Sequence, residues 1–308
     1  MIERFTKRGE ISDEKHLRNE VRKLTLHYLT SFPVRGMWHA YLDKELWMTR
    51  TTLMDIERPK ADQINFLRAV ASRGQSDTFV ILFGDMALLT FANAIDHDYG
   101  DNLFHVVAKH LRESLGEFTW GSYGGDEFVA FGSADSVERV RESIDTFDVN
   151  LGNEDVSKLI PNFTENGIKP RFNIGIATFS EACLLTADIL EQDLNVQEKD
   201  VYRLFVSTYI SLADMRSGIQ KALGHIRLVM DLLESDRERY RRLKPFILKG
   251  CIGISSVLLW KLILIRKCCA RQAFEKILLT HVLAIMRKRA KSPRDRLVTK
   301  AALVPWQQ

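Results

Sequence analysis

The sequence predicts an α+β fold with a central antiparallel sheet, flanking helices and a helical C-terminal extension. Residues 77–83 form a near-continuous apolar run of β-favouring type, as expected of a buried central strand. Residues 123–131 predict a tight hairpin, because two glycines and two acidic residues stand between β-favouring neighbours. Residues 101–115 and 133–148 repeat apolar side chains at helical spacing.

Composition and charge are those of a globular protein with a distinct C-terminal part. The chain has 308 residues, 45% of them hydrophobic, which is enough for one large core or two small ones. From Ile226 onward there are 19 basic and 6 acidic residues, whereas the part before it holds 25 basic and 34 acidic residues. An acidic body with a basic tail indicates that the tail has its own partner: a nucleic acid, an anionic membrane surface or the body itself.

Cysteine usage and the N-terminus predict a cytoplasmic protein. The four cysteines, at positions 183, 251, 268 and 269, show neither metal-site spacing nor a disulfide framework. The N-terminus is charged and lacks an apolar core of signal-peptide length.

Before the first strand, the chain is expected to be largely helical. Within residues 12–29, Leu17, Val21, Leu24 and Tyr28 recur at helical spacing, and residues 36–75 continue in helices. Residues 172–177 predict a further strand, residues 226–230 a closing strand, and residues 231–242 a highly charged helix.

The hairpin carries the chemistry that the sequence suggests most directly. Glycine permits a left-handed backbone and close approach of a ligand, so Gly124 and Gly125 leave room at the turn. Asp126 and Glu127 stand side by side at its tip, and hard divalent cations take carboxylate and phosphate oxygens together. The alternative is an ordinary acidic hairpin.

The stretch from Tyr123 to Phe128, with apolar residues after it, resembles the signature of the GGDEF family, bacterial diguanylate cyclases that condense two GTP into cyclic di-GMP. Other segments resemble the family in the expected order. They are residues 27–38 with Leu29, Thr30, Pro33 and Arg35, then Asp85, Asn93, Gly100-Asp101, residues 172–177, and residues 213–224 with Lys221. The resemblance covers roughly residues 25–230.

The chain also departs from the family pattern. Polar family residues are replaced at His27, Val34, Ala87, Thr90 and His225. Residues 36–75 and 179–206 are longer than the family usually needs. The Arg-x-x-Asp motif of product inhibition falls on Leu115 and Phe118, so inhibition by the usual route is not expected.

The resemblance implies a nucleotidyl-cyclase or palm-like (ferredoxin-like) sheet and the following roles. Asp85, Asp126 and Glu127 would hold Mg²⁺ or Mn²⁺, and Glu127 would also accept the 3′-hydroxyl proton. Asn93 and Asp101 would read guanine, Lys221 would bind the outer phosphates, and Gly124 and Gly125 would admit the substrate. Because each domain holds one GTP, the enzyme would act as a homodimer in bacterial signalling.

The predicted organisation is an N-terminal helix (1–26), a GGDEF domain (27–230) and a basic helical extension (231–308). Residues 246–265 have the length of a membrane span, but Lys249 and Lys261 interrupt them. A span would also carry the basic end to the outer side, against the positive-inside bias. Two interpretations stay open: a helix paired with residues 271–289, and membrane association through 246–265.

Three functions follow as hypotheses. The first is an active diguanylate cyclase, and the second is a degenerate relative that binds GTP or a protein partner. The third makes the basic tail the main function, as an anchor on nucleic acid or a membrane surface whose binding weakens steeply with salt.

Overall fold

The fold is described from a computed structural model of the chain. Described are residues 32–55, 58–73, 79–87, 97–124, 126–153, 171–192, 196–235, 271–290 and 292–306, with Leu89, Asn93, Glu238 and Arg241. The predicted N-terminal helix (1–26) and residues 246–265 lie outside the described residues.

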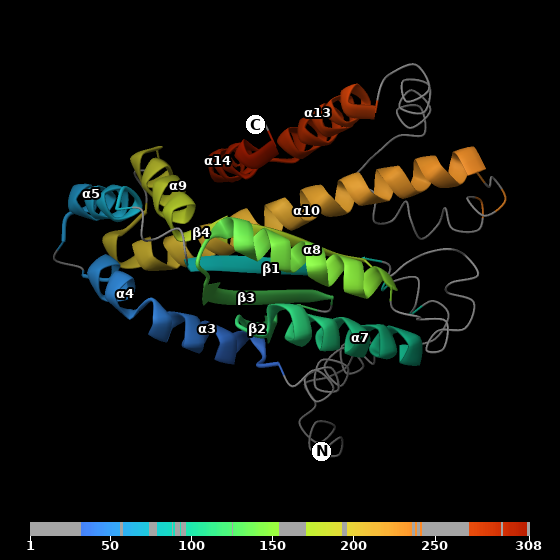
Figure 1. The fold of residues 1–308 in the computed structure, drawn as a ribbon. Coiled ribbons are helices and arrows are strands. Elements are labelled where there is room, and N and C mark those ends of the chain that lie inside the picture. Colours follow the sequence, from blue (N-terminus) through green and yellow to red (C-terminus); the bar gives the residue numbers. More distant parts are fainter. Residues whose placement is uncertain are drawn as a thin grey trace, which may run out of the picture.

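A four-stranded antiparallel sheet forms the centre, in the order β2-β3-β1-β4 (Figure 1). Its strands are β1 (Phe79–Ala87), β2 (Thr119–Ser122), β3 (Glu127–Ser133) and β4 (Arg171–Thr178). The sheet with its flanking helices confirms the predicted α+β class. β1 lies between β3 and β4, which is why its apolar run is buried on both faces.

Helices surround the sheet. They are α3 (Arg35–Glu45), α4 (Trp47–Leu53), α5 (Lys60–Ala71), α7 (His97–Leu115), α8 (Val137–Asn153), α9 (Phe179–Gln192), η3 (Glu198–Asp200), α10 (Val201–Ser235), α13 (Arg271–Arg289), α14 (Pro293–Ala302) and η4 (Val304–Trp306). The predicted helices at 101–115 and 133–148 correspond to α7 and α8. The helical expectation for residues 36–75 is met by α3, α4 and α5.

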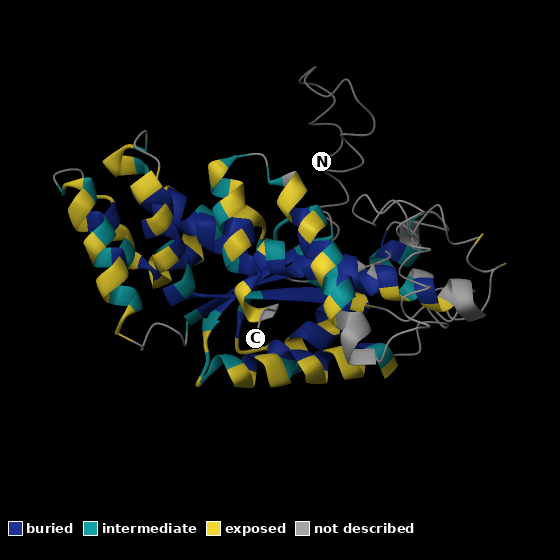
Figure 2. Cartoon of the chain, turned by 90° about the horizontal axis from the view of Figure 1, so that it is seen from above, coloured by how far each residue is buried: buried dark blue, intermediate teal, exposed yellow. Residues whose placement is uncertain are grey.

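The two faces of the sheet are covered by different helices. On one face, Phe104 of α7 and Phe147 of α8 pack through Phe128 and Phe172 of the sheet. α10 crosses the other face (Figure 1). Buried residues accordingly concentrate on the sheet and on the inner sides of the helices (Figure 2).

Gly175 sets how closely α10 approaches the sheet. A Cβ at this position would collide with the backbone of Ala213 and Ser217, so only glycine allows α10 to lie directly on β4. The hydroxyl of Ser217 donates to the carbonyl oxygen of Asn173 at 2.8 Å, which joins helix and strand at the same place. This contact fixes the height of α10 over the sheet.

Two expectations were wrong. The strand predicted at 77–83 does not stop there: β1 continues through Gly84 and Asp85 to Ala87, so Asp85 lies inside the strand. Residues 226–230 do not form a closing strand but continue α10. Ile226 and Met230, four residues apart, are both buried, which is the spacing of one helical face. β4 therefore remains an edge of the sheet.

The C-terminal helices pack on α10 (Figure 1). Val298 and Ala302 of α14 are buried, and the guanidinium of Arg294 donates to the hydroxyl of Ser207 at 2.6 Å. Ser292 and Asp295 form a capping box at the start of α14. Among the residues that the structure describes, no helix is long and apolar enough to cross a membrane.

Candidate active site

The register of the sheet brings two predicted site residues together. Asp85 of β1 lies opposite Glu127 of β3 on one side and opposite Asn173 of β4 on the other. Residues that face each other across strands point to the same side of the sheet. Phe83, two residues before Asp85 on β1, points to the same side and is paired with Gly175. Since Gly175 lies directly against the backbone of α10, the row of Asp85 lies on the side of the sheet that α10 covers.

The hairpin holds Asp126 and Glu127 beside this row. The backbone N–H groups of Tyr123 and Gly124 donate to the carbonyl oxygen of Glu127 at 2.9 and 3.3 Å. The backbone N–H of Met86 donates to the backbone carbonyl oxygen of Asp126 at 3.1 Å. A Cβ at Gly124 would collide with the carboxylate of Glu127. The carboxylate of Glu127 thus folds over Gly124, and a side chain there would displace it; Gly125 lies outside the described residues. Both acidic side chains are partly buried rather than fully exposed at a tip.

Lys221 of α10 reaches down to Asp85. Its Nζ lies 2.6 Å from Oδ1 and 2.7 Å from Oδ2 of Asp85. Both side chains are mostly shielded from water, with 24% and 18% of their surface exposed. The residue expected to bind phosphates therefore neutralises the carboxylate expected to bind metal.

Asp214 joins this group, although the sequence did not single it out. It lies seven residues before Lys221, two turns away on the same side of α10. Burial and the charge of Asp85 raise the pKa of Asp214 to about 6. Asp214 also lines a cavity of about 580 Å³ between α10, α13 and α14, and it is exposed to solvent there, so the neighbouring protein removes only part of its hydration. We call Asp85, Asp126, Glu127 and Asp214 the acidic group.

The charges of the acidic group act on one another. The pKa of Glu127 is raised by burial first and then by the negative charges of Asp214, Asp126 and Asp85. Burial also raises the pKa of Asp85, although Lys221 opposes this shift. The site concentrates negative charge at the end of two strands, and a single lysine offsets part of it.

The donors of the acidic group fit a hard divalent cation, because they are carboxylate oxygens whose mutual repulsion a cation would relieve. Their spacing does not yet form a cage. Within the described part of the chain, no three carboxylate, imidazole or thiol side chains converge closely enough to hold a metal ion. A cation would enter only as Lys221 releases Asp85.

Of the predicted guanine-reading residues, Asn93 contacts the start of α7, the helix that carries Asp101. A Cβ at Gly100 would collide with the side-chain oxygen of Asn93, so Asn93 lies against the residue that precedes Asp101. Asp101 stands in the first turns of α7 and its side chain is largely shielded.

The entry segment contacts the hairpin. The N–H of Ser122 donates to the carbonyl oxygen of Pro33 at 2.9 Å, and the guanidinium of Arg35 lies 4.1 Å from the ring centroid of Tyr123. Leu115 and Phe118, which occupy the positions of the inhibition motif, are both buried in the core.

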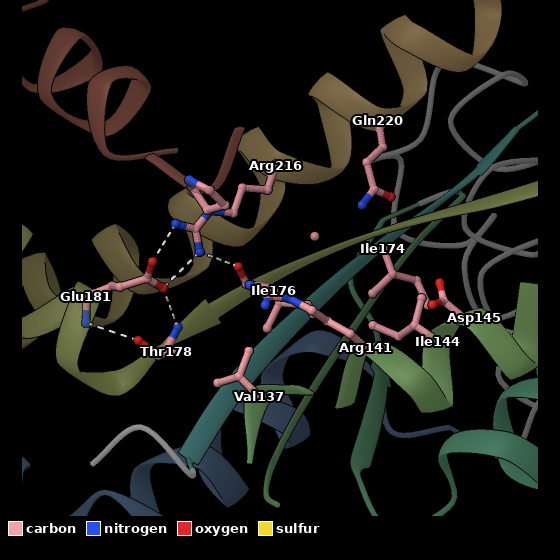
Figure 3. A pocket seen from close by; sticks show the side chains of 12 residues that line it. Val137, Arg141, Ile144, Asp145, Ile174, Ile176, Thr178, Glu181, Arg216 and Gln220 are labelled. Carbon is pink, nitrogen blue, oxygen red and sulfur yellow. Dashed lines mark hydrogen bonds and ion pairs between the residues drawn. The ribbon is translucent and has the colours of Figure 1, made fainter. Parts of the chain in front are cut away.

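A second cavity, of about 410 Å³, lies between α8, β4 and α10 (Figure 3). At one end the guanidinium of Arg216 forms two hydrogen bonds to Glu181, at 2.8 and 2.6 Å. Hydrogen bonds from Arg216 and Thr178 hold the pKa of Glu181 below its ordinary value. None of the predicted site residues lines this cavity.

Comparisons with known proteins give structural likeness only. No family model and no curated protein matches the sequence. Solved structures that match include the GGDEF domain of TpbB (also YfiN) from Pseudomonas aeruginosa, with 19% identity, 58% of this chain and 97% of that chain covered, and a TM-score of 0.36.

Two further matches are the GGDEF domain of DgcB from Caulobacter crescentus, in complex with c-di-GMP, and the diguanylate cyclase SiaD from P. aeruginosa, in complex with its activator SiaC. The first has 18% identity, coverage of 43% of this chain and 80% of that chain, and a TM-score of 0.31. The second has 16% identity, coverage of 61% and 76%, and a TM-score of 0.29. GGDEF domains are the family that the hairpin motif predicts.

Proposed function

We propose that this chain belongs to the GGDEF family and is a diguanylate cyclase, which joins two GTP molecules into cyclic di-GMP and releases pyrophosphate. One observation carries the proposal. Carboxylates from two paired strands and from α10 lie with Lys221 beside a hairpin in which the carboxylate of Glu127 folds over Gly124. Triphosphate chemistry needs this combination, because it depends on positioning and on neutralising phosphate charge.

The acidic group would hold Mg²⁺ or Mn²⁺ through Asp85, Asp126 and Glu127. When bound, the cation neutralises triphosphate charge and orients the phosphates. In the free protein, Lys221 supplies the positive charge that Asp85 needs. On substrate binding, the ammonium of Lys221 would turn to the outer phosphates, since cation and lysine compete for the same carboxylate.

Glu127 is the residue best suited to take a proton. In each condensation a 3′-oxygen forms a bond to the α-phosphorus of the other GTP, and the bond from that phosphorus to the bridging oxygen of pyrophosphate breaks. The hydroxyl proton must leave, and Glu127 would accept it. Its raised pKa makes it a stronger base than an ordinary carboxylate.

Asn93 and Asp101 would select guanine. Their side-chain oxygens can accept from the N1–H and N2–H₂ groups of guanine, which adenine lacks. The position of Asn93 against Gly100, the residue before Asp101, supports this role. Because one domain holds one GTP, cyclisation requires two copies that face each other, and we propose a homodimer as the active form.

The test is to incubate the purified full-length protein with GTP and Mg²⁺ or Mn²⁺ and to resolve the nucleotides. Wild type should form cyclic di-GMP. Asp126→Ala removes a carboxylate and the cation that depends on it, and should slow the reaction by about 10³-fold or more. Glu142→Ala, which removes an exposed carboxylate on α8, should leave the rate unchanged. No product from wild type under any of these conditions refutes the cyclase.

The second candidate function is a degenerate domain that binds GTP without turning it over. It is favoured by the contact of Lys221 with both oxygens of Asp85, which keeps a predicted metal ligand occupied. Calorimetry with GTP and Mg²⁺ separates the two functions, because a GTP-binding regulator shows binding that Asp126→Ala weakens and no product in the nucleotide assay.

A further inference from the structure

Two segments that are longer than the resembling family needs meet in the structure. The first contains α4 and α5, and the second contains α9, η3 and the start of α10. The side-chain amide of Gln63 on α5 donates to the carbonyl oxygens of Leu53 and Glu198, at 3.1 and 3.3 Å. The guanidinium of Arg68 lies 2.9 Å from the carboxylate of Glu191. The two segments therefore form one packed unit beside the sheet (Figure 1).

A cavity of about 420 Å³ lies where this unit meets the hairpin. Its walls come from α3, α4, the hairpin, η3 and α10. This volume falls within the range of small-molecule sites, about 300–1,000 Å³. The residues of the acidic group do not line it.

The cavity is positively charged. Arg35, Arg50, Lys199 and Arg203 line it, and Asp43 is its one acidic residue among those described. Asp43 already accepts from the hydroxyl of Tyr202 at 2.7 Å and lies 3.8 Å from Arg50. Outside the lining, Asp200 lies 3.9 Å from Arg203. Two carboxylates do not neutralise four cations, so the lining favours an anion with more than one charge.

Aromatic rings stand among these cations. Tyr123 and Tyr202 line the cavity, but the ring of Tyr202 is buried and the guanidinium of Arg35 covers the ring of Tyr123 at 4.1 Å. A nucleobase can stack on the plane of a guanidinium group. Cations for phosphates and the Arg35–Tyr123 stack for a base are thus combined in one cavity.

The same cavity touches the hairpin of the candidate active site. Tyr123 precedes Gly124, and its backbone N–H donates to the carbonyl oxygen of Glu127 at 2.9 Å. A ligand that displaces Arg35 or presses on Tyr123 would act directly on the turn that holds Glu127.

We propose that this cavity binds a phosphate-bearing nucleotide, separate from the GTP of the reaction, and that its occupancy adjusts the hairpin. The binding part stands on the cavity alone. The regulatory part rests on the proposed cyclase function.

Binding is tested on the full-length protein by calorimetry with ATP, with inorganic pyrophosphate and with adenosine. ATP is chosen because the predicted active site reads guanine. Lys199→Glu/Arg203→Glu reverses two exposed charges of the lining, and the Arg203 side chain is 85% exposed, so the fold should persist. ATP binding should weaken at least about tenfold. Lys109→Glu/Arg139→Glu makes the same charge change on exposed positions of α7 and α8 and should bind as wild type.

Three outcomes would overturn the binding proposal. They are the absence of ATP binding at about 1 mM, equal ATP binding by both double variants, and pyrophosphate binding as tight as that of ATP. The last outcome would mean that the rings contribute nothing and that the site takes free phosphate. Thermal unfolding of both double variants shows that a loss of binding is not a loss of fold.

The proposal and the cyclase function can fail separately. Asp126→Ala should keep ATP binding, because Asp126 does not line the cavity. If wild type binds ATP at the cavity but makes no cyclic di-GMP, the cyclase fails and the site stands. If wild type makes cyclic di-GMP, ATP should change the rate of its formation at least about twofold in wild type and leave it unchanged in Lys199→Glu/Arg203→Glu. An equal effect of ATP on both proteins overturns the regulatory part.

Discussion

The ion pair of Lys221 and Asp85 gives the sharpest prediction, because it joins stability to the site. Lys221→Met keeps most of the side-chain volume and removes the ammonium. Asp85 is then left as a largely shielded carboxylate without its partner. Breaking a fully buried pair costs about 3–5 kcal/mol, and the 18–24% exposure of this pair reduces that figure. We expect the free energy of unfolding to fall by about 1–3 kcal/mol at pH 7.5.

The pH dependence has a definite sign. Without Lys221, burial and the negative charge of Asp126 act unopposed on Asp85, and its pKa rises further above the ordinary value. A carboxylate whose folded-state pKa is raised destabilises the fold above that pKa and ceases to do so once it is protonated. The loss caused by Lys221→Met should therefore be larger at pH 7.5 than at pH 4.5.

Chemical denaturation at both pH values gives the free energy of unfolding of four proteins: wild type, Lys221→Met, Asp85→Asn and the double variant. In the double variant Asp85 no longer leaves a shielded charge without a partner, so this variant should be more stable at pH 7.5 than Lys221→Met alone. Exposed Lys109→Met on α7 is the control and should change stability by less than about 0.5 kcal/mol. Equal losses for Lys221→Met and Lys109→Met at pH 7.5 would refute the reasoning.

Three further changes follow from other contacts. Gly175→Ala places a methyl group against the backbone of α10, so the free energy of unfolding should fall by about 1–3 kcal/mol and Tm by several degrees. Gly152→Ala, with open space around it, should not destabilise the protein, and equal melting temperatures of the two variants would contradict the contact. Asp214→Asn should raise Tm at pH 8 and change it little at pH 4.5, because the carboxylate ionised above a pKa of about 6 opposes folding. A larger rise in Tm at pH 4.5 than at pH 8 would contradict this reasoning. If the basic tail drives dimerisation, a chain lacking residues 271–308 should show a lower mass in light scattering than full length, and an unchanged mass would exclude that role.

Local patterns in the sequence predicted the elements that depend on local chemistry. The apolar run at 77–83 and the hairpin at Gly124 were found because burial and turn geometry restrict residue types directly. Residues 226–230 were misread for a physical reason. They follow the segment 213–224 that resembles the family, but in the structure Gly224 makes room for the guanidinium of Arg171 and α10 continues past it.

The composition of the candidate site was only partly accessible from sequence. Asp85, Asp126, Glu127 and Lys221 were predicted from a resemblance, but the contact of Lys221 with Asp85 joins residues 136 positions apart. Asp214 was missed because an acidic residue in a helix has no distinctive pattern of its own. Its role appears only when the register of the sheet places Asp85 beneath α10.

α10 links the basic C-terminal helices to the acidic group. Arg216 of α10 donates to the carbonyl oxygen of Ala301 at 3.4 Å, and Arg294 holds Ser207. On its other side, α10 lies on Gly175 without space for a methyl group, so it cannot approach β4 more closely. The C-terminal helices and β4 therefore hold α10 from opposite sides. Lys221 reaches Asp85 from a helix whose position both sets of contacts fix, which explains why residues so far apart in sequence meet at one site.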